Sequence, residues 1–178
     1  MLTTPDEQVL ERARTYDAQA LAEIYDRYAG SIYAYLYHVL GDAAQAEDLT
    51  GEVFLRLLQA LRTGRAPRDR LKGWLYQVAH NLAMDWFRRQ KKGPSAPLSE
   101  DLAADDGQPS DIVEDGQVRQ ELRAGIQRLT PDQQQVILLR FAEEFPAAEV
   151  ARLMGKSEGA VKILQHRAVI RLRKLLEE

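Results

Sequence analysis

Residues 157–176, SEGAVKILQHRAVIRLRKLL, carry five Lys or Arg and one His against a single acidic residue, Glu158. Lys162 and Gln165 have side chains that hydrogen-bond to base edges, and Arg167 or Arg171 suits a phosphate. The whole chain has net charge -3, so this positive charge is local. The segment is therefore a candidate for nucleic-acid binding, although a basic amphipathic helix can also be solvated or bind a protein partner.

A second basic segment, RLKGWLYQVAHNLAMDWFRRQKK at 70–92, interleaves aromatic and cationic residues. Aromatic rings stack on unpaired bases while Lys and Arg follow the phosphates, which is the pairing that single-stranded nucleic acid requires. Tryptophans at helical spacing are also typical of a core. We therefore expect Trp74 and Trp86 to be at least partly buried.

The remaining chemistry-bearing residues do not form a catalytic pattern. His38, His80 and His166 are isolated, no carboxylates have metal-ligand spacing, and there is no glycine-rich phosphate loop. The absence of cysteine excludes disulfides, thiolate metal sites and a cysteine nucleophile. We expect no enzyme activity, no metal and no cofactor.

The chain has no apolar run near eighteen residues, and its N-terminus lacks a basic start followed by an apolar run. These features predict no signal peptide and no membrane insertion, and they favour a cytoplasmic location.

Apolar residues recur almost everywhere with helical spacing, so we predict an all-α fold. Thr4 and Thr130 each precede Pro and have Glu or Gln three residues later, which is the pattern of a capped helix start. Asp42 with Gln45 repeats the cap, and Gly30, Gly41 and Gly64 are expected to separate helices. The predicted helices are 5–15, 18–29, 31–40, 43–62, 70–91, 112–128, 131–143, 147–154 and 157–176.

Residues 93–117 interrupt this pattern with three Pro, three Gly, seven Asp or Glu and no Lys or Arg. Such a segment buries too little apolar surface to offset its chain entropy, so we interpret it as a flexible acidic linker that becomes helical near Ile112. It predicts two small helical domains, at 1–92 and 118–178.

The second domain has the pattern of a helix-turn-helix. Val150 and Ala151 fall on the inner face of a short helix, Gly155 suits the turn, and Ser157 can cap the following helix. That second helix would enter the major groove. An apolar stripe follows at Val161, Leu164, Ala168, Leu172 and Leu175. An operator-binding regulator would use a similar helix, but the first half shows no strands for the receiver or ligand domain that such regulators carry.

Three segments together resemble the bacterial sigma factors of the extracytoplasmic-function (ECF) type, within the sigma-70 family. AEDLTGEVFLRLLQAL at 46–61 is similar to region 2.2, and LKGWLYQVAHNLAMDWFRRQKK at 71–92 to regions 2.3 and 2.4. Residues 126–176 resemble region 4. The resemblance implies that the chain binds the RNA polymerase core and directs it to promoters.

In the first domain the resemblance implies that Asp48, Glu52 and Arg56 dock on the β′ clamp coiled coil, with Leu49, Val53 and Leu57 in the core. Gly51 stands where the family usually has Gln. The promoter minus-10 element, captured as single strand and melted, would be contacted by Asn81, Asp85, Trp74, Arg88 and Arg89.

In the second domain the resemblance implies that the duplex minus-35 element is read, and Lys162-Ile163-Leu164 departs from the Arg-Ser-Arg that the family often has there. The implied contacts are Ser157, Lys162, Ile163, Gln165, His166 and Arg167. The β-flap of the polymerase would pack on Val136, Leu139, Phe141 and Phe145. The linker would run through a basic channel of the polymerase, and an anti-sigma factor would be a further partner.

Overall fold

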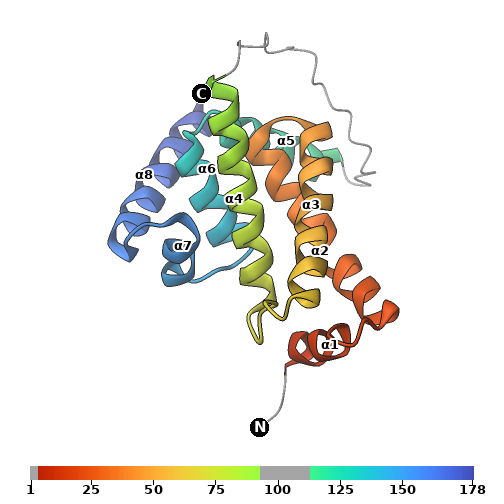
Figure 1. Cartoon of the computed structure of the whole chain (residues 1–178). Helices are drawn as coiled ribbons and strands as arrows, with labels where there is room; N and C mark the ends of the chain where they lie inside the picture. Colours follow the sequence, from red (N-terminus) through yellow and green to blue (C-terminus); the bar gives the residue numbers. More distant parts are fainter. Residues whose placement is uncertain (1–3, 93–112) are drawn as a thin grey trace. The chain divides into compact units, whose positions relative to one another are not determined.

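The computed structural model describes residues 4–92 and 113–178, and every regular element within these ranges is helical (Figure 1). The expected all-α fold is confirmed. The chain divides into two compact units, Met1–Ser95 and Ala96–Glu178. Most of the proposed linker lies outside the described residues. The elements are α1 (Pro5–Ala13), α2 (Ala18–Leu40), α3 (Ala43–Arg62), α4 (Leu71–Lys92), α5 (Val113–Gln127), α6 (Pro131–Ile137), the π-helical turn η1 (Leu138–Ala142), α7 (Ala147–Met154) and α8 (Glu158–Glu177).

Helix starts follow the caps that the sequence predicts. The Glu7 amide donates to Thr4 Oγ1 across 3.2 Å, and the Thr4 amide donates back to Glu7 Oε2. Asp42 Oδ1 accepts from the Gln45 amide at 3.0 Å to open α3. Each cap satisfies backbone donors that would otherwise have no partner, so local sequence alone fixes these starts.

Helix α2 differs from the sequence prediction, because it runs unbroken from Ala18 to Leu40 through Gly30, and the predicted helix 131–143 is divided into α6 and η1. Ile24, Tyr28, Ile32 and Leu36 follow at steps of four and are all buried, so one apolar face continues across the glycine. The helix ends instead at Gly41, whose φ of 71° is left-handed. Gly30 therefore weakens the helix without ending it.

The core of the first unit lies where α2 packs against both α3 and α4. The buried rings of Tyr35 and Tyr76 meet edge to face there, with centroids 5.5 Å apart. Tyr76 is fully buried and is not available to stack on a base, so this aromatic residue of the segment 70–92 does not contribute to the expected nucleic-acid surface. The aliphatic part of this core includes Ile24, Ile32, Leu36, Val53, Leu57, Leu71 and Leu75.

Helix α1 is fastened to α2 by Asp6. Its carboxylate accepts from Arg27 Nη1 and from the Tyr28 hydroxyl, each across 2.5 Å. Burial, together with the hydrogen bond to Asp6, raises the pKa of Tyr28 well above its usual range, while the hydrogen bond from Arg27 to Asp6 raises the pKa of that guanidinium. The phenol therefore stays a hydrogen-bond donor at neutral pH.

In the second unit, α8 packs against α5, α6 and α7. Ile126, Leu129, Ile137 and Ala168 form a buried cluster, and Leu172 packs against it. Gly125 lies where α5 meets α8, and a Cβ there would lie 2.8 Å from Leu172 Cδ1, so a larger residue would have to displace that side chain.

Helices α7 and α8 form the predicted helix-turn-helix. Val150 and Ala151 are buried, and Gly155 ends α7 with a left-handed φ of 64°. Ser157 then opens α8, because its Oγ accepts from the Ala160 amide across 3.1 Å. Val161 and Ala168 are fully buried, so the expected apolar stripe faces inward.

Across residues 4–92 and 113–178, every helix is too short or too polar to cross a lipid bilayer. The described part of the chain also contains no group of three or more His, Asp or Glu side chains placed to hold a metal ion.

Candidate nucleic-acid interface

Helix α3 presents an acidic face to solvent. Leu49, Val53 and Leu57 are buried as predicted, which turns the residues one position away outward. Asp48 and Arg56 are exposed and Glu52 is half-buried. Arg56 Nε lies 3.3 Å from Glu52 Oε1, and a solvent-accessible pair of this kind contributes little to stability. We call the surface formed by Asp48, Glu52 and Arg56 the α3 face.

Apolar residues that sequence reasoning did not single out border the α3 face. Tyr25 is 51% exposed, and its ring meets Phe54 with centroids 5.0 Å apart. Leu55 and Leu58 on α3 are also exposed. A charged surface flanked by an exposed aromatic ring and exposed leucines is typical of a protein interface. Their only sequence signal is that Leu55 and Leu58 lie off the buried stripe of their helix.

Helix α4 places the residues assigned to single-stranded DNA on its outer side. Asn81 is exposed, and its Oδ1 accepts from Gln77 Nε2 across 3.1 Å. One turn later Asp85 accepts from Arg88 Nη2 across 2.6 Å. Arg88 and Arg89 remain exposed at the end of the helix. The helix therefore carries a polar amide site followed by exposed positive charge.

Both tryptophans of α4 are half-buried, as predicted. Trp86 meets Phe87 edge to face, with ring centroids 5.2 Å apart. The inner face is closed by Leu71, Leu75 and Leu82, whereas Trp74 and Trp86 each retain some exposed surface. An aromatic ring in this position can support the helix and still meet an unstacked base.

The outer face of α8 contains the residues assigned to duplex DNA. Lys162, His166 and Arg167 are exposed, and Ile163 is 55% exposed. Lys162 Nζ lies 3.5 Å from Glu158 Oε1, one turn earlier. Ser157 is occupied as the cap of α8, so its part in this face is to fix where the helix begins.

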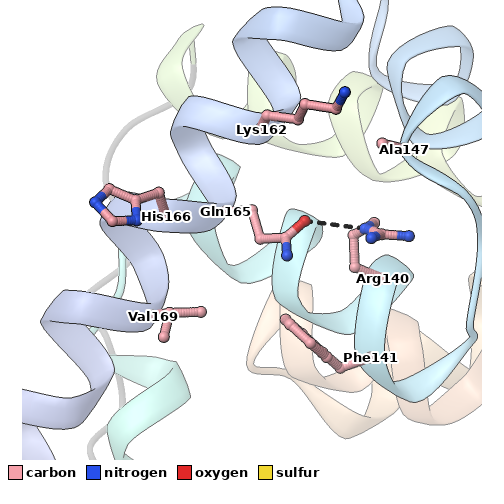
Figure 2. A pocket seen from close by; sticks show the side chains of 7 residues that line it. All are labelled: Arg140, Phe141, Ala147, Lys162, Gln165, His166 and Val169. Carbon is pink, nitrogen blue, oxygen red and sulfur yellow. Dashed lines mark hydrogen bonds between the residues drawn. The ribbon is translucent and has the colours of Figure 1, made fainter.

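Gln165 differs from the other predicted contacts, because it is half-buried and tied to η1. Its Oε1 accepts from Arg140 Nε across 2.9 Å (Figure 2). Arg140 was not identified from the sequence. Its only signal there is that it is the single cation in the apolar run VILLRF, and the contact joins residues 25 positions apart.

The expected apolar surface for the β-flap is largely wrong. Val136, Leu139 and Phe145 are buried in the core of the second unit and present no side-chain surface to a partner. Phe141 is 56% exposed and is the one member of that set that faces solvent. The error arises because a run of apolar residues does not reveal which of them α7 and α8 cover.

Both halves of the chain match family models. Residues 24–93 match sigma-70 region 2, and residues 119–172 match sigma-70 region 4. The ECF RNA polymerase sigma factor SigX of Bacillus subtilis is 32% identical over 86% of this chain and 82% of its own length. BldN of Streptomyces coelicolor, another ECF sigma factor, is 38% identical over 96% of this chain, which spans 66% of that relative.

Solved structures share the fold at lower identity. CnrH, in complex with the cytosolic domain of CnrY, matches with a TM-score of 0.69 and 19% identity over 97% of each chain. The sigma factor RpoE of Bartonella quintana, in complex with the anti-sigma factor NepR, matches with a TM-score of 0.66 and 20% identity over 88% of this chain and 96% of its own. With the two region matches and SigX, the conclusion is that the chain belongs to the ECF sigma factors of the sigma-70 family.

Proposed function

We propose that this chain is a promoter-specificity factor that binds the RNA polymerase core, captures the minus-10 element through α4 and reads the minus-35 duplex through α8. The observation that carries the proposal is that the region 2 and region 4 matches each contain a surface suited to its task. The chain would act in the cytoplasm and have no catalytic activity of its own.

The α3 face is the proposed docking surface for the β′ clamp coiled coil. Asp48 and Glu52 supply negative charge for a basic partner, and exposed Leu55 supplies apolar contact area. A mixed face of this kind combines electrostatic steering with hydrophobic burial. Phe141 is the candidate contact for the β-flap, because it is an exposed aromatic on η1.

The proposed contacts to single-stranded and to duplex DNA rest on different interactions. On α4, the Asn81 amide can read the edge of an unpaired base while Trp74 or Trp86 stacks and Arg88 and Arg89 meet phosphates. On α8, Lys162, Ile163 and His166 are exposed in the half of the helix that enters the major groove in this motif. An exposed Ile163 can contact a thymine methyl.

We also propose that an anti-sigma factor holds the chain inactive by covering the polymerase-binding surfaces, as the family resemblance implies. The exposed apolar residues beside the α3 face support this, because they would remain uncovered until the core binds. Co-purification of the native protein before and after the inducing stress would identify that partner by mass spectrometry.

The proposal is tested by run-off transcription with purified core polymerase, the full chain and a library of genomic promoter fragments. We expect discrete start sites that depend on adding the chain. Core enzyme that initiates equally with and without it on every fragment would refute the proposal. Duplex binding by the chain without any effect on initiation would favour an operator-binding regulator instead.

A further inference from the structure

The amide of Gln165 has one orientation. Arg140 Nε, a nitrogen that only donates, lies 2.9 Å from Gln165 Oε1. Turning the amide over would place its NH₂ against a donor, so the oxygen must face Arg140. Among the residues that the structure describes, none accepts a hydrogen bond from Gln165 Nε2. One lone pair of the carbonyl oxygen is thus used within the protein, and the NH₂ is available.

Arg140 is itself held in place. Its Nη1 donates to the Phe145 carbonyl across 2.8 Å, while its Nε holds Gln165. The residue lies in η1 and is half-buried, next to the buried Leu139. If Gln165 moved away, its side-chain carbonyl and the Arg140 guanidinium would each lose a hydrogen bond while partly buried, which disfavours the change. Arg140 is therefore held by two hydrogen bonds and positions Gln165.

Gln165 lies in a hollow on the side of α8 that carries Lys162 and His166 (Figure 2). Lys162 precedes it by one turn and Val169 follows it by one turn, and both line the same hollow. Ala147, the first residue of α7, borders it as well. The amide thus belongs to the surface that the proposed function places against the major groove.

This orientation changes what a glutamine can read. A glutamine free to turn reads adenine with two bonds, its oxygen accepting from N6 and its nitrogen donating to N7. Both amide atoms must then lie side by side in the plane of the base. Here the bond from Arg140 takes one lone pair of the oxygen and keeps the amide from turning over, so the NH₂ is the group left without a partner for a base edge.

We infer that Arg140 holds Gln165 so that it acts as a hydrogen-bond donor, which selects guanine or thymine at one position of the minus-35 element. Guanine offers N7 and O6 and thymine offers O4, whereas cytosine offers only its N4 amino donor. Adenine offers N7 but loses its usual advantage of a second bond. The inference rests on the proposed function. It adds Arg140 as a positioning residue, which sets base specificity by holding Gln165.

The test uses holoenzyme assembled from core polymerase and the full chain, with promoter fragments randomised through the minus-35 element and bound fragments sequenced. For the wild type we expect one position that favours guanine or thymine. Arg140→Met frees the carbonyl, and adenine should rise there by about 10-fold relative to guanine. Arg140→Lys keeps a donor for Oε1 and should restore the wild-type preference. Arg152→Met removes an exposed Arg of α7 and should change no preference.

A second variant keeps the inference testable if Arg140→Met does not fold. Gln165→Glu keeps an acceptor for Arg140, so its thermal unfolding should match the wild type, yet it offers no donor to a base. The preference for guanine or thymine at that position should be lost. Unchanged base preferences in both Arg140→Met and Gln165→Glu would overturn the inference while minus-35 selection by the wild type upholds the proposed function. A wild-type holoenzyme that selects no minus-35 sequence would overturn both.

Discussion

On α4 the side-chain nitrogen of Gln77 donates to Oδ1 of Asn81 one turn later, and the two atoms are 3.1 Å apart. The bond holds the amide of Asn81 by its oxygen while the residue stays exposed. The NH₂ group of Asn81 is then left to donate to a partner. An amide held in this way loses less conformational freedom when it meets a base than a free one would.

Asn81→Ala should therefore slow open-complex formation by about 10-fold, since one directed hydrogen bond contributes roughly 1.5 kcal/mol. Core affinity should change little, because Asn81 lies on α4 and the α3 face is intact. Gln77→Ala should give a smaller loss in the same assay, since it removes only the positioning bond. The measurement is permanganate reactivity of melted thymines, with Gln19→Ala on α2 as the control. An equal loss of core binding would show that Asn81 acts in docking.

For the α3 face we expect the change in core binding itself, which Asn81→Ala should leave nearly unaffected. Asp48→Lys reverses an exposed charge and should weaken core binding by at least about 10-fold, because a basic partner would then meet like charge. Glu11→Lys on α1 makes the same charge change at a residue with an exposed side chain and should leave the affinity unchanged. Fluorescence anisotropy with labelled chain and core measures both. Equal affinity for Asp48→Lys and the wild type would remove this face from the docking surface.

Lys162 is exposed in the first half of α8, where a contact to the DNA backbone is within reach of its side chain. Lys162→Ala should reduce the slope of log affinity against log salt by about 1, because one phosphate contact releases about one counterion. Lys174→Ala removes the same charge in the last turn of α8 and should leave the slope near the wild-type value. A wild-type slope in Lys162→Ala would exclude a phosphate contact, and a changed base preference would assign Lys162 to a base edge instead.

The sequence predicted elements that depend on neighbours along the chain. The caps at Thr4 and Thr130 and the left-handed ends at Gly41 and Gly155 are local, so a few residues determine them. Gly30 was expected to end a helix, but the continuous buried face of α2 against α3 and α4 outweighs one unfavourable residue.

The candidate sites also divide into features that follow from neighbouring residues and features that depend on tertiary packing. The outward position of Asp48 follows from the helical period, because Leu49 and Val53 are buried beside it. The bond between Arg140 and Gln165 joins η1 to α8, and only the packing of the second unit brings those residues together. The sequence also could not show that Phe141 is exposed while Leu139 and Phe145 are buried, because all three lie in one apolar run.

Gly51 lies in the middle of α3, and a Cβ at this position would meet no atom within 4 Å. Nothing in the described fold therefore needs a glycine there, although it lowers helix stability by about 1 kcal/mol relative to alanine. Gly51→Ala should raise the free energy of unfolding by that amount and the melting temperature by roughly 4–8 °C for a unit of this size. Thermal unfolding followed by circular dichroism measures it.

Gly41→Ala is the matched control, because open space surrounds this glycine too, but its φ of 71° strains any residue with a Cβ. It should destabilise the unit by about 1–2 kcal/mol. Gly51→Gln then introduces the residue usual in the family at a position lined by Tyr25, Tyr33 and Asp48 in the hollow between α2 and α3. If core affinity increases along with stability, the glycine tunes polymerase binding. A rise in stability with unchanged affinity would confine its effect to the helix.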